Sequence, residues 1–175
     1  CLGLGPEVIW YLSQVIRSVS LACFGNQRGN DVFNIDETYV SEHGNFAIIR
    51  GNAGDDTITG IDTDAANGVE ITIRADYVNA ADSVTVNLGT QSATSTAGGD
   101  AAGIGNDTLV NVSEIQGSSY GDFLTGNGDD NSIRGRGGDD TIDGGGGTDR
   151  AVYARSLDQV VVNLYRPLIR MQMNA

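Results

Sequence analysis

Residues 117–152 read GSSYGDFLT, GNGDDNSIR, GRGGDDTID and GGGGTDRAV, four copies of one nine-residue phrase without a gap. Every copy has glycine at position 1, Asp or Asn at position 6 and an apolar residue at position 8. The residues at position 6 are Asp122, Asn131, Asp140 and Asp149, and those at position 8 are Leu124, Ile133, Ile142 and Ala151. A short fixed period indicates a solenoid, because one unit cannot bury its apolar side chain alone.

The first six residues of each copy predict a tight turn, and the last three predict a short strand. Gly, Asn and Asp tolerate positive φ, which tight turns require. Position 8 lies in the middle of the strand, so its side chain faces inward while its two neighbours face outward. If each copy makes half a coil, a turn stacks on the turn eighteen residues further on. Asp122 then lies beside Asp140, and Asn131 lies beside Asp149.

Stacked acidic turns predict a calcium site. Neighbouring strands are roughly 4.8 Å apart and calcium binds oxygen at roughly 2.3 to 2.6 Å, so one ion fits between two turns. Without an ion, two carboxylates at ~5 Å repel by about 3 kcal/mol at an effective dielectric constant near ~20. The carbonyl groups of the turns lie outside any ladder and are expected to supply the remaining oxygens.

These residues resemble the RTX, or hemolysin-type, calcium-binding repeat, GGxGxDx(apolar)x. GRGGDDTID at 135–143 and GNAGDDTIT at 51–59 match well, Gly-Asn-Asp fragments begin at Gly29 and Gly105, and a looser resemblance extends over 25–164. The resemblance implies an all-β chain that forms a right-handed parallel β-roll with short flanking strands, with Ca²⁺ as its cofactor. It also implies ligands from the side chain at position 6 and from turn carbonyls at about positions 1, 3 and 5. These residues are Asp122, Asp140, Asn131, Asp149, Asp56, Asp31, Asp107, Gly117, Ser119, Gly121, Gly135, Gly137 and Asp139.

Several residues depart from the motif. Tyr120 and Asp129 replace the glycine of position 4, Asn131 brings no charge, and Ala151 offers little apolar surface. Asp56 has no carboxylate eighteen residues away in either direction. In a simple register, Asp56 therefore lacks a partner.

The charge of the chain favours metal binding and argues against a nucleic-acid partner. Twenty-three acidic residues, 18 of them Asp, face ten Arg and no Lys, which gives a net charge of −13. Binding to phosphate requires a basic surface, whereas Asp is the short carboxylate that suits turns and calcium. A glycine-rich acidic chain is also typical of disorder, so we expect its order to depend on the ion.

A longer period connects DSVTVNL at 82–88 with DQVVVNL at 158–164, seventy-six residues later. Both segments predict strands. VEITIR at 69–74 predicts another strand, which we expect to pair with the first of them beside the roll. The echo indicates one unit of a tandem array. We expect five segments: an atypical apolar flank at 1–24, degenerate RTX-like repeats at 25–68, a strand-rich connector at 69–116, the β-roll at 117–152, and the start of a next unit with an atypical tail at 153–175.

Both ends of the chain differ in composition from the rest. Every Pro, Met, Cys and Trp lies in 1–24 or 165–175. Two explanations stay open: the flanks cap the ends of the roll, or they are out of frame and foreign to it. Residues 8–24 predict a short helix, too short and too polar to span a bilayer. We therefore expect no membrane partner.

No catalytic constellation is complete. Residues 117–121 match the G-x-S-x-G elbow, with Ser119 as the nucleophile. However, the single histidine, His43, lies upstream of it, and the same residues are already explained as the first turn. One histidine cannot build a zinc protease site. We expect that the chain is not an enzyme.

Three interpretations of the function follow. In the first, the chain is a calcium-binding β-roll module of a secreted bacterial repeat protein, of the adhesin or surface type, that folds on calcium outside the cell. In the second, it is the C-terminal calcium-binding region of an exported RTX protease, lipase or cytolysin. In the third, it is a disordered acidic fragment. The echo favours the first. The resemblance implies export by type I secretion machinery and an extracellular or cell-surface location, with neighbouring repeats of a longer chain as further partners.

Overall fold

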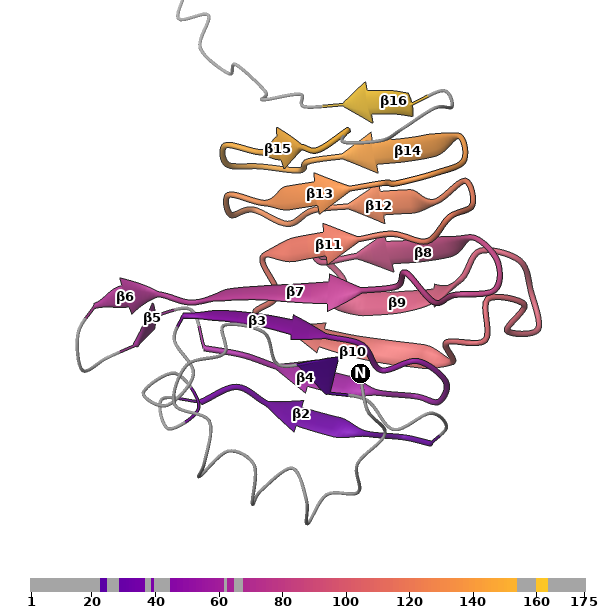
Figure 1. Ribbon diagram of the computed structural model, residues 1–175. Coiled ribbons are helices and arrows are strands. Elements are labelled where there is room, and N and C mark those ends of the chain that lie inside the picture. The colour runs from indigo at the N-terminus through magenta and orange to yellow at the C-terminus, as the bar shows by residue number, and fades with distance from the viewer. Residues whose placement is uncertain are drawn as a thin grey trace, which may run out of the picture.

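The computed structural model describes residues 23–24, 29–36, 39, 45–61, 63–64, 68–153 and 160–163. Every element with defined bounds in these residues is a β-strand, so the prediction of an all-β chain is confirmed. The strands form a six-stranded sheet, an eight-stranded sheet and a small antiparallel ribbon of β5 (Thr63–Asp64) and β6 (Val69–Glu70) (Figure 1). Within the described part of the chain, no helix has the length and apolar character needed to cross a bilayer.

The two large sheets contain short strands. The six-stranded sheet has the order β1 (Cys23–Phe24), β3 (Phe46–Ile49), β7 (Thr72–Asp76), β11 (Glu114–Gln116), β13 (Ser132–Arg134) and β15 (Arg150–Ala151). The eight-stranded sheet has the order β16 (Val160–Asn163), β14 (Asp140–Asp143), β12 (Phe123–Thr125), β8 (Val84–Asn87), β9 (Ser92–Ser95), β10 (Asn106–Val110), β4 (Thr57–Thr59) and β2 (Val32–Asn34).

Apart from the ribbon and the run from β8 to β10, consecutive strands alternate between the two sheets. In the nonapeptide block, β12 pairs with β14 in parallel, Leu124 opposite Ile142, and β13 pairs with β15, Ile133 opposite Ala151. Both pairs confirm the predicted eighteen-residue register. The position 8 side chains of the first three copies are 1% exposed and belong to one apolar core with residues from both sheets, whereas Ala151 is only partly buried against it.

An excursion interrupts this alternation. β9 lies antiparallel between β8 and β10, which adds two strands to the eight-stranded sheet. β10 then pairs in parallel with β4, Leu109 opposite Ile58. The turn that leads into β10 therefore stacks on the turn that leads into β4, although Asp56 and Asp107 at the ends of these turns are 51 residues apart in the sequence.

Two expectations about strands are corrected. Residues 69–74 do not form one strand beside the roll, because Val69–Glu70 belongs to the ribbon while β7 lies inside the six-stranded sheet between β3 and β11. β8 pairs with β12 and β9, not with this segment. The echo at 158–164 does contain a strand, β16, which pairs with β14 in parallel.

The expectations about both flanks fall largely outside the described residues. Of the helix predicted for 8–24, only Cys23 and Phe24 are described, and they form strand β1. His43 and residues 164–175 lie outside the described ranges, and the proposed division into five segments stays a prediction.

Candidate metal centre

The candidate ligands lie on two edges of the stacked sheets. We call the turns that lead into the eight-stranded sheet the first edge and those that lead into the six-stranded sheet the second edge. The first edge carries two columns of stacked turns: a lower column, whose turns end in Asp31, Asp56 and Asp107, and an upper column, whose turns end in Asp122 and Asp140. The second edge carries the pair Asn131 and Asp149.

The side chain at position 6 ties each turn to its neighbour. In every case its Oδ1 accepts the backbone N–H of the residue that holds the same position in the turn below. The pairs are Asp122 N to Asp140 Oδ1 (3.0 Å), Asn131 N to Asp149 Oδ1 (3.0 Å), Asp31 N to Asp56 Oδ1 (2.8 Å), Asp56 N to Asp107 Oδ1 (3.0 Å) and Val84 N to Asp122 Oδ1 (2.9 Å). Position 6 therefore has a structural role that does not depend on an ion.

Asp56 is where the sequence-based expectation was wrong. The structure places a carboxylate on each side of it, from Asp31, 25 residues before, and from Asp107, 51 residues after. The eighteen-residue rule fails because the chain makes excursions between these turns. Asp56, from a full copy of the motif, thus belongs to one column with Asp31 and Asp107, which were identified only from short fragments.

Position 5 makes a second ladder that runs in the opposite direction, and the sequence reading missed it. Here the N–H of the upper turn donates to the side-chain oxygen of the lower turn: Asp55 N to Asn30 Oδ1 (3.0 Å), Asn106 N to Asp55 Oδ1 (2.8 Å) and Thr148 N to Asp130 Oδ1 (2.6 Å). The available signal was the recurrence of Asn or Asp at this position. The two ladders fix the register of the turns.

Position 1 is glycine because the Oδ2 atom of position 6 lies against it. A Cβ atom on Gly51, Gly117, Gly135 or Gly144 would overlap Oδ2 of the aspartate five residues on. The absence of a side chain at position 1 therefore leaves room for the carboxylate oxygen itself in all four turns. In the lower column, Asp56 Oδ2 is buried and has no hydrogen-bond partner among the described residues. A buried anionic oxygen without a hydrogen-bond donor is the environment that a cation fits.

Backbone carbonyls face the neighbouring turn in the upper column. Gly135 O and Asp139 O each lie 2.8 Å from where a Cβ atom would stand on Gly117 and Gly121, and Ser119 O lies 3.5 Å from that point on Gly137. Positions 1, 3 and 5 thus all supply oxygens near the space between the turns. No group of three or more Asp, Glu, His or Cys side chains that suits a metal exists in the described residues. These carbonyls would therefore have to complete any calcium site, as calcium accepts carbonyl ligands.

Burial of the carboxylates makes their charge unfavourable. Asp56, Asp107 and Asp122 are 1%, 4% and 0% exposed. Desolvation is the largest cause that raises the pKa of Asp56 to about 6 and that of Asp122 to about 6. The negative charge of a stacked neighbour, Asp31 for Asp56 and Asp140 for Asp122, also raises the pKa. Desolvation and the negative charge of Asp56 raise the pKa of Asp107 to about 7. The columns therefore hold protons more tightly than solvated carboxylates do, and a divalent cation relieves the same cost.

Two residues that the sequence reading missed bind these carboxylates. Ser118 is fully buried, and both its N–H and its Oγ donate to Asp122 at 2.7 Å. Tyr77 is buried and its hydroxyl donates to Asp107 Oδ2 at 3.1 Å. A serine just after a turn glycine is typical of side-chain-to-backbone turn motifs, whereas no local pattern connects Tyr77 with Asp107. Ser119 is exposed and precedes strand β12 rather than a helix.

The comparisons with known proteins agree with this geometry. The family model of the RTX calcium-binding nonapeptide repeat matches residues 48–60 and 116–151, with four copies. No curated protein matches the chain. The matched residues include the glycine and aspartate positions of the upper column, the second edge and the middle turn of the lower column. RTX nonapeptides are calcium-binding motifs, and the matched residues of this chain carry four copies of them.

Proposed function

We propose that the chain is a calcium-binding module of a secreted bacterial repeat protein, of the adhesin or surface type, and that calcium completes its fold as a right-handed parallel β-roll. The observation that carries this proposal is the shared geometry of the turns. In each nonapeptide turn with Asp at position 6, that side chain bonds to the adjacent turn through Oδ1 and rests its Oδ2 against a glycine.

Residues at different positions of the turns have different roles in the proposed site. The ladders of positions 5 and 6 hold the turns in register, and the position 1 glycines leave room for the carboxylates of position 6. Gly135, Asp139 and Ser119 present carbonyl oxygens near that space, and Asp140, Asp122 and Asp149 present carboxylates. Bound calcium supplies the positive charge that turns the repulsion between stacked carboxylates into attraction.

The nonapeptide block buries few apolar side chains, which leaves much of its folding free energy to the metal. The nonapeptide block contributes Leu124, Ile133 and Ile142 to the core, and each buried side chain stabilises the fold by only about 1.5 to 3 kcal/mol. Since a metal site does not exist in the unfolded chain, its binding free energy adds to folding. Calcium is abundant outside cells, so we propose that the module is exported, through type I secretion, before it folds.

The seventy-six-residue echo favours a repeat protein over an appendage of an exported enzyme. β8 and β16 occupy equivalent places in the two copies of the echo, and both lie parallel to a nonapeptide strand of the eight-stranded sheet. A chain built from such units needs no catalytic domain to explain its fold. We propose that it acts as a binding and structural module and not as an enzyme.

A calorimetric titration of the full chain with CaCl₂ tests the proposal, with MgCl₂ as the matched control. We expect saturable calcium binding accompanied by a gain of β-structure in circular dichroism, and much weaker binding of magnesium, which prefers a compact octahedral shell with several waters. Absence of heat and of any spectral change at millimolar calcium would overturn the proposal.

A further inference from the structure

We propose that the outer face of strands β13 and β15 binds the anionic groups of a polysaccharide, and that Arg134 and Arg150 are the residues that hold them. The inference deepens the proposed function, because it names what a surface module would bind. It rests on that function for the calcium-folded state in which the face exists. None of the proposed calcium ligands lies on these two strands.

The arginines of the described residues gather on one sheet. Each lies on a strand of the six-stranded sheet or within two residues of the end of such a strand: Arg50, Arg74, Arg134, Arg136 and Arg150. The strands of the eight-stranded sheet, by contrast, contain no arginine in their described residues. In a chain with a net charge of −13, the six-stranded sheet is therefore the part of the described surface that favours an anion.

Arg134 and Arg150 point out of this sheet because side chains alternate along each strand. Ile133, just before Arg134, is 1% exposed and faces the core. Ala151 packs against the same core, and Arg150, just before it, is exposed. Ser132 lies opposite Arg150 on the neighbouring strand. The two arginines are thus offset by one strand and two residues, which places their Cα atoms about 8 Å apart.

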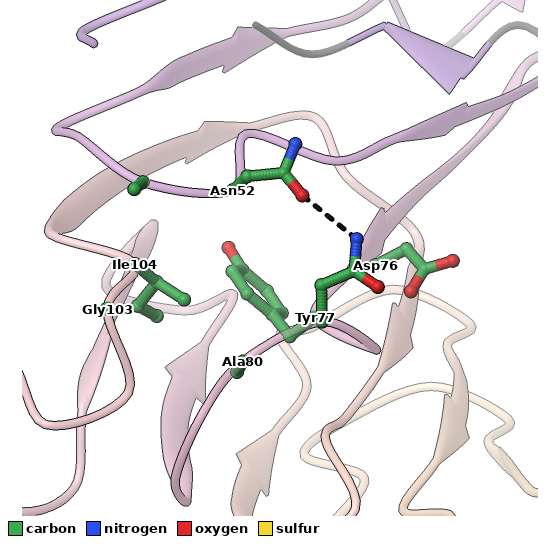
Figure 2. Close-up of a pocket in the computed structure, with 8 residues that line it drawn as sticks. Asn52, Asp76, Tyr77, Ala80, Gly103 and Ile104 are labelled. Atoms are coloured by element: carbon green, nitrogen blue, oxygen red, sulfur yellow. Dashed lines mark hydrogen bonds between the residues drawn. The ribbon is translucent and has the colours of Figure 1, made fainter. Parts of the chain in front are cut away.

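Elsewhere on this sheet, two ion pairs neutralise arginines. Arg74 donates to Glu114 Oε2 from Nε at 2.8 Å and from Nη2 at 2.5 Å. Arg50 donates to Asp76 Oδ2 at 2.7 Å. Asp76 also lines a cavity of about 370 Å³ (Figure 2), and none of the described residues that line this cavity is basic. These two ion pairs therefore leave little positive charge for an anion.

Arg134 is held by a neutral group instead. Its Nη1 donates to Oε1 of the buried Gln116 at 2.8 Å, and its Nε has no acceptor among the described residues. An amide orients a guanidinium without cancelling its charge, whereas a carboxylate does both. The ion pairs of the described part of the chain include neither Arg134 nor Arg150. Both arginines therefore keep their charge, and a guanidinium suits planar and tetrahedral oxyanions.

The surroundings of the two arginines favour a polysaccharide over other polyanions. Ser132 places a half-buried hydroxyl beside Arg150, and Tyr153, three residues after Arg150, is 43% exposed. A hydroxyl and an aromatic ring suit the mixed polar and apolar surface of a sugar. Duplex DNA, with one charge every ~1.7 Å, would also meet the acidic turns at both edges of the sheets and be repelled. A polysaccharide with widely spaced carboxylates or sulfates is the occupant that fits this face.

Calorimetric titration of the full chain with dextran sulfate, in saturating calcium, tests the inference, and uncharged dextran is the matched control. We expect saturable binding of dextran sulfate that NaCl weakens, and no binding of dextran. Arg134→Gln and Arg150→Gln should each lower the affinity by about tenfold or more, as is typical for the loss of a hydrogen bond to a charged group. Binding of carboxymethyl dextran would support the inference as well, and the tighter of the two charged polymers shows whether the face prefers sulfate or carboxylate.

Gln116→Glu is the sharpest variant, because it places a carboxylate beside Arg134 and changes little else. We expect it to weaken binding about as much as Arg134→Gln does, while circular dichroism shows that the variant still folds on calcium. The matched control is Asn87→Asp, which adds the same charge on β8 of the eight-stranded sheet and keeps the acceptor for Thr90 N–H. This control should bind dextran sulfate as tightly as wild type.

Three results would overturn the inference. In the first, Asn87→Asp weakens binding as much as Gln116→Glu, so that net charge and not this face controls binding. In the second, the double variant of Arg134 and Arg150 binds like wild type, so that calcium bridges at the acidic turns hold the polymer. In the third, duplex DNA binds as tightly as dextran sulfate. Folding on calcium without binding of either charged polymer also overturns this inference alone, whereas the absence of folding on calcium means that the proposed function itself fails.

Discussion

Two substitutions of Asp140 should separate its structural role from its ionic role. Asp140 is 1% exposed, and its Oδ1 accepts the N–H of Asp122 at 3.0 Å. Asp140→Ala leaves this buried N–H unsatisfied, which costs about 1 to 3 kcal/mol whether calcium is present or not. Asp140→Asn keeps an acceptor and removes one of two stacked charges, whose repulsion is at most about 3 kcal/mol at ~5 Å and a dielectric constant near ~20.

The sign of the Asp140→Asn effect should therefore change with calcium. In chelator we expect the variant to be as stable as wild type or more stable. In saturating calcium we expect it to be less stable, because losing one of the two carboxylates should weaken binding by roughly tenfold or more, about 1.4 kcal/mol or more. Urea denaturation followed by circular dichroism, with and without calcium, measures both.

A matched control is available on the same strand. Asp143→Asn keeps the acceptor for Gly145 N–H and should leave both stabilities within about 0.5 kcal/mol of wild type. Asp100 is not a neutral control, although it lies outside the nonapeptides, because its Oδ1 accepts two backbone N–H groups of its own turn. If Asp140→Asn destabilises equally in chelator and in calcium, the reasoning about repulsion is wrong.

Three further predictions follow from the same contacts. In chelator, the free energy of unfolding should fall as the pH rises from about 5 to 8. The reason is that the folded state still holds protons on Asp56, Asp107 and Asp122, whose pKa is raised to about 6 or 7, while the unfolded state has lost them. A urea midpoint that rises over this range would contradict this prediction. Gly135→Ala should weaken calcium binding, since its Cβ would overlap Asp140 Oδ2, whereas Gly128→Ala, with nothing within 4 Å, should not; calorimetry compares the two. In calcium, Ile133→Ala should destabilise by about 2 to 5 kcal/mol, while exposed Phe123→Ala should change the thermal midpoint little; equal shifts would refute the core assignment.

The nonapeptide block could be predicted because its period is constant. A repeat of nine residues with one turn and one strand determines which turns stack, so the pairing of Asp122 with Asp140 follows from counting. The same reasoning found the inward-facing residues Leu124 and Ile133. Local pattern is sufficient wherever the chain makes no excursion.

The lower column could not be predicted, because its register depends on the length of the excursions. The chain leaves the alternation in the β5–β6 ribbon and again in β8 to β10. Nothing in the residues around Asp56 indicates how many residues lie between it and its stacked neighbours. The contact of Tyr77 with Asp107 arises from the same cause, since it joins a strand connection to a turn thirty residues away.

Hydrogen exchange of the full chain, with calcium and with chelator, tests the central claim most directly. The account predicts that calcium strongly protects the backbone N–H groups of residues 117–152, among them those of Asp122 and Asn131, whose acceptors are the side chains of the stacked turns. Equal protection of this block in chelator and in calcium would contradict it.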